Sequence, residues 1–152
     1  MTTHRLLVLA ALAAALLALF LAVRPQRSAL LPRLTPGVAN AEIGQADIRA
    51  TICRSGWTKT VRPPTEYTNA LKLEQMRRYG ERGLPSAYQE DHLISLELGG
   101  DPTDPRNLWP EPYPRASAMD QIENELNAQV CSGKLSLRQA QDRESELKHT
   151  QG

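Results

Sequence analysis

An uncharged run of leucine and alanine residues, Leu6–Val23, decides which part of this chain is able to form a soluble domain. It follows the short basic segment Met1–Arg5 and ends at Arg24. A cleaved signal peptide has an apolar region of roughly 7–15 residues, whereas a membrane-spanning helix needs about 20. Because the run has no polar face, it is not the pattern of a helix packed on a soluble core. Residues 1–24 are therefore expected to be a signal-anchor or a cleaved signal peptide.

The remaining chain divides into three parts. Residues 25–42 contain several prolines and predict a poorly ordered linker. Residues 43–148 have the length of one ordinary domain, and residues 149–152 form a short tail. The membrane is therefore an expected partner through the N-terminal helix, and the sequence predicts no oligomeric state.

The chain has two cysteines, Cys53 and Cys131, and neither belongs to a Cys-x-x-Cys pair. Zinc-knuckle spacing is therefore absent. In an exported domain such a pair most simply forms one disulfide, which the chain-entropy model values at about 4 kcal/mol. The alternative is two separate buried thiols. A disulfide would place the domain in the periplasm or outside the cell, anchored in the inner membrane or secreted if the signal is cleaved.

Charge is distributed unevenly along the chain. All 17 acidic residues lie from Glu42 onward against 14 of the 18 basic residues, since the other four precede it, so this part has a formal charge of −3. Tight nucleic-acid binding usually requires a strongly basic surface, which is missing here. Basic residues nevertheless gather in residues 54–82 and acids in residues 83–126. One part of the domain is expected to face phosphates and the other to hold a cation.

Local patterns predict helices and strands in alternation. A helix is predicted to stop at Gly80, and a later one to begin at Ser136, where Ser-Leu-Arg-Gln has the form of a capping box. Gly99-Gly100 ends the longer predicted strand. The predicted elements are a short strand or extended entry segment at 48–53, a helix at 66–79, strands at 88–98 and 107–109, a helix from Pro114 or Ser117 to about Val130 with a stripe of Met119, Ile122, Leu126 and Val130, and a last helix from 136.

Residues with useful chemistry concentrate in the second half of the domain. His92 is a candidate general base, because an unperturbed histidine has a pKa of about 6.5. Asp91 would point to the opposite face of a regular strand, so the two share a site only at a strand end or a bulge. Asp120 and Glu123 lie one helical turn apart and would offer oxygen ligands to magnesium, manganese or calcium.

The order Asp91-His92, Gly99-Gly100 and Asn107-Leu108 resembles the HNH (His-metal finger) nucleases. The longer pattern, with Cys53-Arg-Ser-Gly-Trp-Thr and the late Cys131, is similar to small exported bacterial HNH-like proteins of unknown role. The resemblance implies an α+β fold, in which a small ββα-metal core carries flanking helices and follows the N-terminal transmembrane or signal helix. It also implies metal-dependent hydrolysis of phosphodiester bonds in DNA or RNA.

Site roles follow from the same resemblance. His92 would be the general base, Asp91 a metal ligand, and Asn107 the residue that orients His92. The last histidine of the family is absent, so Asp120 or Glu123 would take its place. The expected cofactor is a divalent metal, magnesium first and manganese or calcium as alternatives, with no organic cofactor. Apart from the resemblance, the expected phosphate contacts are Arg77, Arg78 and Arg106, of which Arg77 and Arg78 are also compatible with a solvated helix end.

Each of these residues also has a structural interpretation. His92 alone is compatible with a hydrogen-bonded core histidine, Asn107 with a turn residue, and Asp120 and Glu123 with solvated helix acids. The competing hypothesis is therefore a non-catalytic envelope module that keeps the HNH scaffold for binding or structure. A calcium-stabilised interaction domain is a third, weaker hypothesis.

Overall fold

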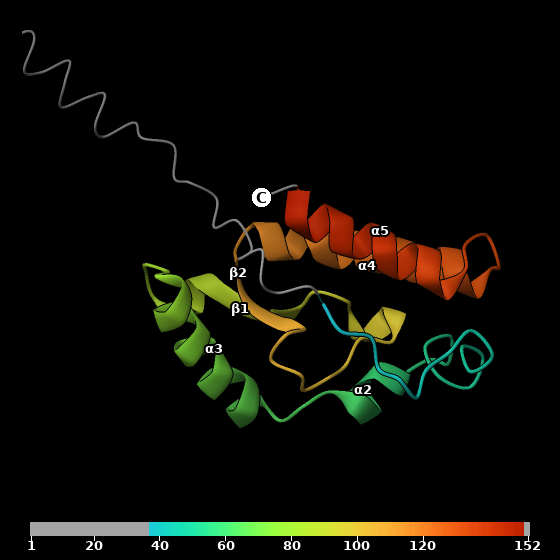
Figure 1. Ribbon diagram of the computed structural model, residues 1–152, viewed down its shortest axis with the longest axis horizontal. Coiled ribbons are helices and arrows are strands. Elements are labelled where there is room, and N and C mark those ends of the chain that lie inside the picture. Colours follow the sequence, from blue (N-terminus) through green and yellow to red (C-terminus); the bar gives the residue numbers. More distant parts are fainter. Residues whose placement is uncertain (1–36, 151–152) are drawn as a thin grey trace, which may run out of the picture.

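The computed structural model describes residues 37–150 and gives them a mixed α+β fold, as predicted from the sequence (Figure 1). The predicted signal-anchor, residues 1–24, and most of the predicted linker lie outside the described residues. Between residues 37 and 150 no helix has the length and apolar character needed to cross a membrane. The elements are α2 (Trp57–Val61), α3 (Thr65–Tyr79), β1 (Tyr88–His92), β2 (Leu108–Pro112), α4 (Arg115–Cys131) and α5 (Leu137–Thr150).

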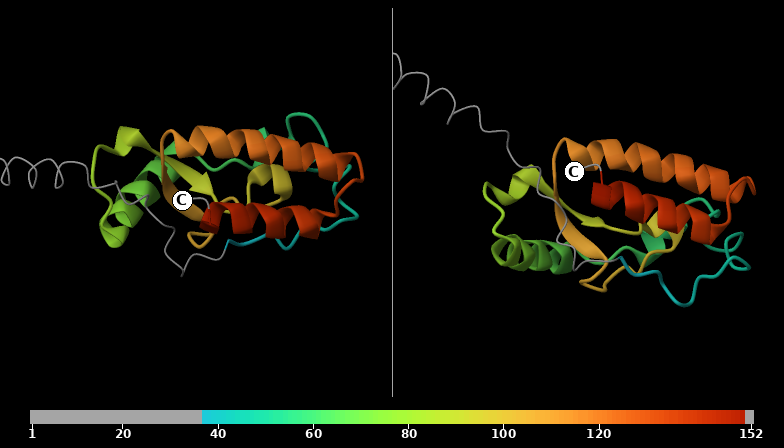
Figure 2. Two further views of the ribbon diagram at one scale, coloured as in Figure 1. Left: turned by 90° about the horizontal axis from the view of Figure 1, so that it is seen from above. Right: turned by 45° about the horizontal axis from the view of Figure 1, so that its top comes forward.

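The two strands form an antiparallel pair at the centre of the molecule. Asp91 is opposite Trp109, and His92 is opposite Leu108. Helix α3 packs on one face of this pair, while α4 and α5 lie side by side across the other face (Figures 1 and 2). Side chains that alternate along β1 therefore reach two different environments.

The strands differ in length from those predicted. The strand expected at 88–98 ends at His92, and Leu96–Leu98 forms a 3₁₀ turn. It ends early because the side chain of Asn107 takes both the N–H and the carbonyl of Ile94, at 3.0 Å each, in place of a partner strand. The second strand extends to Pro112, beyond the predicted end at residue 109.

The short strand expected at 48–53 is wrong. Its backbone N–H groups bond to carbonyls three to five residues earlier, as in Thr51 N to Asp47 O at 3.0 Å and Cys53 N to Ile48 O at 2.8 Å. These local turns leave no extended segment to pair with β1 or β2. The short helix α2 that follows was not predicted.

The longer helices agree with the sequence patterns. Helix α3 ends at Gly80, which has a φ of 70°. Before α5, Ser136 Oγ accepts the N–H of Gln139 at 3.2 Å, and Gln139 Oε1 accepts the N–H of Ser136 at 2.9 Å, so the predicted capping box is present. Helix α4 buries Met119, Leu126 and Val130 and partly covers Ile122 on its apolar stripe.

The core joins both ends of the domain. Ile43, Ile48 and Ile52 pack with Leu126 and Val130 of α4, together with residues of the 3₁₀ turn and α5. The predicted disulfide between Cys53 and Cys131 is present and links the turns of 47–53 to the end of α4. Backbone contacts with the domain begin before Ile43, the boundary expected from the sequence, because residues 37–40 bond to the loop after β1.

Candidate functional site

The end of β1 presents Asp91 and His92 to opposite sides, as the alternation of a regular strand requires. The carboxylate of Asp91 lies on the side of α4 and α5, where it contacts Lys148. The imidazole of His92 turns toward the loop that follows, with Nε2 3.2 Å from the carbonyl oxygen of Pro102. Both side chains are buried, and no hydrogen bond joins them within the described part of the chain.

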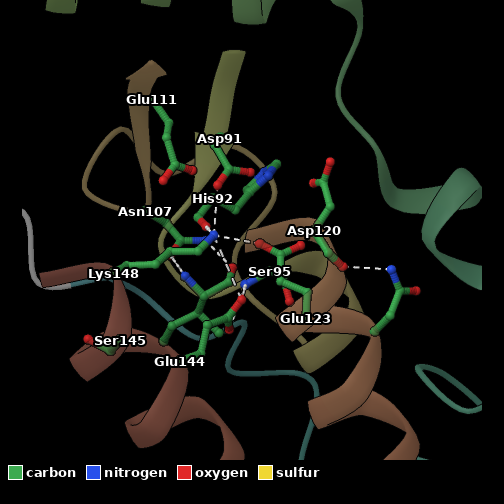
Figure 3. A network of polar contacts seen from close by, with 12 residues as sticks. Asp91, His92, Ser95, Asn107, Glu111, Asp120, Glu123, Glu144, Ser145 and Lys148 are labelled. Carbon is green, nitrogen blue, oxygen red and sulfur yellow. Dashed lines mark hydrogen bonds and ion pairs between the residues drawn. The ribbon is translucent and has the colours of Figure 1, made fainter. Parts of the chain in front are cut away.

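Lys148 is the centre of the polar cluster on the α4–α5 side (Figure 3). Its Nζ lies 2.7 Å from Asp91 Oδ2, 2.6 Å from Glu123 Oε1 and 2.5 Å from the backbone carbonyl oxygen of His92. An ammonium group has three N–H donors, and these three acceptors use all of them. The Lys148 side chain is 0% exposed, so this cation is enclosed by oxygen atoms of the protein.

Glu144 supports the cluster from one turn earlier on α5. Both of its carboxylate oxygens accept the backbone N–H of Ser95, at 3.1 and 3.0 Å, and Oε1 lies 3.8 Å from Lys148 Nζ. Glu144 therefore ties α5 to the segment just after β1 while adding negative charge beside the ammonium.

Charge in this cluster is set by burial and by Lys148. Burial alone would lower the pKa of Lys148, but Asp91, Glu123 and Glu144 outweigh it and raise the pKa. Burial would likewise raise the pKa of Asp91, and the ammonium instead lowers it to about 2. Burial dominates at the other two acids and raises the pKa of Glu123 to about 9 and that of Glu144 to about 7. Lys148 and Asp91 are thus a charged pair, whereas burial makes Glu123 hold a proton more tightly than an exposed glutamate would, against the opposing effect of the ammonium.

Glu111 and Arg115 form a second, largely buried pair next to Asp91. Burial and the neighbouring Asp91 raise the pKa of Glu111, which is fully buried, to about 9. Arg115 Nε lies 3.1 Å from Glu111 Oε1, and its guanidinium lies 5.0 Å from the ring centroid of Trp109. The same guanidinium donates to the backbone carbonyl of Lys148. Arg115 therefore connects the start of α4 to the last turn of α5.

Asn107 shapes the loop that contacts His92. Its Oδ1 accepts the N–H groups of Val38 and Ile94 at 3.0 Å, and its Nδ2 donates to Ile94 O at 3.0 Å and to Asp101 O at 2.8 Å. Asp101 precedes Pro102, whose carbonyl oxygen contacts the imidazole. Asn107 therefore fixes the backbone just after His92, at Ile94, and just before Pro102, at Asp101. Any effect of Asn107 on the orientation of His92 acts through this loop.

The remaining predicted site residues lie apart from Lys148. Asp120 is exposed on α4 and stands away from the cluster that contains Glu123 (Figure 3). Arg78 pairs with Glu74 at 2.5 Å, and Arg106 pairs with Asp104 at 2.6 Å. Arg77 is an exposed residue in the last turn of α3. The structure thus brings Asp91 and Glu123 together and leaves Asp120, Arg77, Arg78 and Arg106 on the surface.

The arrangement does not fit a divalent metal as it is folded. Asp91, Glu123 and the His92 carbonyl supply the oxygen ligands that such ions prefer, but they converge on the nitrogen of Lys148. Among residues 37–150, no group of three or more His, Cys, Asp or Glu side chains is placed to hold a metal ion.

Sequence reasoning missed Lys148 and Glu144. Glu144 and Lys148 stand at i and i+4 on α5, a spacing common in exposed helical ion pairs, so the pattern alone did not mark them as part of a site. Their burial arises from the packing of α5 on α4 and on the segment after β1, which no local pattern indicates.

No protein-family model, no curated protein and no solved structure matches this chain.

Proposed function

We propose that this domain hydrolyses phosphodiester bonds in nucleic acid, with His92 as the general base. The observation that carries the proposal is the imidazole of His92, fixed at the end of β1 by the carbonyl of Pro102. The order of the Asp-His pair, the glycine turn, Asn107 and the following helix resembles the HNH nucleases. The pairing of β1 with β2 and the packing of α4 on them are compatible with the ββα core of that family.

The environment of His92 suits proton transfer from water. Burial lowers the pKa of His92 below its ordinary value of 6.5, although Asp91 partly opposes this effect, so the folded domain favours the neutral imidazole. When Nε2 carries the proton and donates to Pro102, Nδ1 keeps a lone pair. In hydrolysis, the water oxygen attacks phosphorus and the ester P–O bond breaks. Nδ1 takes the water proton, and the leaving oxygen takes a proton from solvent.

From the basic segment, we add Arg62 to the proposed phosphate contacts near His92. It is exposed and caps the end of α2. Its positive charge is the last of the causes that lower the pKa of His92, after burial and Lys148. Arg77, Arg78 and Arg106 stay predicted contacts for the flanking backbone.

A metal-dependent reaction remains part of the family resemblance, with magnesium, manganese or calcium as the expected ion. In the folded arrangement Asp91 and Glu123 are occupied by Lys148, so we assign no catalytic step to a metal.

The disulfide supports an oxidising compartment for this activity. Disulfides persist in the periplasm and outside the cell and are rare in the cytosol. Since Cys53 and Cys131 are bonded, we propose that the domain meets DNA or RNA in the envelope or outside the cell, with the N-terminal helix as its membrane anchor or export signal.

A second candidate is a non-catalytic envelope module that keeps the scaffold for binding or structure. The position of Lys148 favours this candidate. Lys148 pairs with Asp91 and Glu123, the predicted metal ligands, so the cluster is a buried structural network of ion pairs. In this case the protein would bind its partner equally well with or without the imidazole.

Cleavage of plasmid DNA and of RNA by the oxidised protein tests the proposal. Reactions would contain magnesium, manganese, calcium or EDTA, beside His92→Ala and His92→Gln. The Gln amide retains an N–H for the Pro102 carbonyl but is no proton acceptor at neutral pH, so His92→Gln should stay folded by circular dichroism. Both variants should lose cleavage. Cleavage by His92→Gln at the parent rate would eliminate His92 as the base. Absence of cleavage by the folded parent in every condition would favour the binding module.

A further inference from the structure

We propose that Lys148 and a divalent cation compete for the same oxygen atoms of Asp91, Glu123 and the His92 carbonyl, so that a metal binds there only after Lys148 has left. The ammonium is then the resident cation of the cluster in the closed domain. This inference concerns cation binding and holds whether or not the domain cuts nucleic acid.

The geometry makes the two cations mutually exclusive. The three oxygens lie 2.5–2.7 Å from Nζ, and metal–oxygen distances for magnesium and calcium are about 2.0–2.6 Å. Both ions therefore need the same central position. Two positive charges confined there would repel each other strongly in a buried site.

The position between the three oxygens is occupied by the ammonium and is also shielded from solvent. The side chains of Asp91 and Glu123 are 8% and 11% exposed, and that of Lys148 is not exposed. The ammonium protons all point to protein acceptors, so Lys148 has none left for a phosphate or a bound water. Lys148 in this conformation thus blocks the site rather than serving a ligand.

The route by which Lys148 would leave is the last turn of α5. Lys148 stands close to the end of this helix, where terminal turns open more easily than the centre. The contact from Arg115 to the Lys148 carbonyl holds this turn against α4. Glu144 lies one turn earlier and is held by the Ser95 N–H, so the helix is able to open beyond it while the rest stays packed.

Lys148→Met tests the competition directly. Methionine keeps the length and helix propensity of the side chain but removes the charge. Lys134→Met, at an exposed lysine outside the cluster, is the matched control. Manganese binding to the oxidised, full-length proteins would be measured by calorimetry and by the electron paramagnetic resonance of the free ion, without nucleic acid.

Lys148→Met is expected to bind manganese at least about tenfold more tightly than the parent and Lys134→Met, and adding Glu123→Gln should remove the gain. Equal affinity of Lys148→Met and the parent would overturn the proposal. So would a gain that survives Glu123→Gln. Since no substrate is present, failure here is distinct from failure of the proposed nuclease activity.

Acetylation of lysines in the parent, read by mass spectrometry, tests the enclosed position of Lys148 even if Lys148→Met does not fold. Without metal, Lys148 should react much more slowly than Lys134. If the parent binds manganese through Glu123, so that Glu123→Gln weakens binding, Lys148 must become reactive as the site fills. Lys148 that stays protected while this site is loaded, or that reacts as fast as Lys134 without metal, would refute the competition.

Discussion

Glu90 shows what burial does to a carboxyl group of this domain away from Lys148. It lies on β1, where alternation directs it to the face opposite Asp91. Neither of its carboxylate oxygens has a hydrogen-bond partner among residues 37–150. Burial raises the pKa of Glu90 to about 8, and Lys72 only partly opposes this. The folded domain therefore favours the protonated form of this side chain.

The stability of the parent should fall relative to Glu90→Gln as pH rises. A raised pKa means that the contribution of Glu90 is fully present below its ordinary value of 4.5 and is lost as pH passes through about 8. Gln is neutral throughout and lacks this loss. Thermal unfolding from pH 4 to pH 9 would measure the effect, with Glu125→Gln, an exposed acid on α4, as the control for removal of one charge. A parent-to-variant difference that does not change with pH would contradict the prediction.

Among the elements, the loop between β1 and β2 depends on a close approach of backbone to backbone. A Cβ atom added to Gly100 would lie 1.8 Å from the carbonyl oxygen of Ile94 and 2.8 Å from Asn107 Nδ2. Both atoms belong to the hydrogen bonds that hold this loop in place. The Gly-Gly pair noticed in the sequence is thus required by packing at its second position.

Gly100→Ala should destabilise the domain by about 3 kcal/mol or more, because the backbone must move to remove the overlap. Urea unfolding of the oxidised protein would measure the loss. Gly44→Ala is the matched control, since the added Cβ there would meet only Asp47 Oδ2, at 3.4 Å. If both variants unfold at the same urea concentration as the parent, the close packing around Gly100 is not as described.

The elements that the sequence predicted correctly are those with local signals. The C-terminal end of α3 follows from Gly80, and the start of α5 follows from the reciprocal Ser136–Gln139 hydrogen bonds. The early end of β1 was not predictable, because it depends on Asn107, distant in sequence from Ile94. Asp91 and Glu123 were predictable as candidate ligands because they are acids in the segment that resembles a known family. Lys148, which occupies their oxygen atoms, was not predictable, because its contact with Asp91 arises only from the packing of α5.

At the scale of the whole molecule, two structural connections cross the domain. The Lys148 cluster joins β1, α4 and α5 through buried charge. The disulfide joins the turns before α2 to the end of α4, at the other end of that helix from Arg115. The segment 47–53 forms only local turns, so its position depends on the core contacts of Ile48 and Ile52 and on Cys53.

Loss of the disulfide should lower the free energy of unfolding by about 4 kcal/mol, the chain-entropy value for a loop of this size. Cys53 and Cys131 are 78 residues apart, so the bond restricts most of the unfolded domain. Urea unfolding of the oxidised protein, the reduced protein and the Cys53→Ser/Cys131→Ser variant would measure it. Because the backbone hydrogen bonds of residues 47–53 lie within local turns, the reduced domain should also release this segment first, seen as faster amide exchange there. Unchanged stability on reduction would mean that the core contacts alone hold this segment.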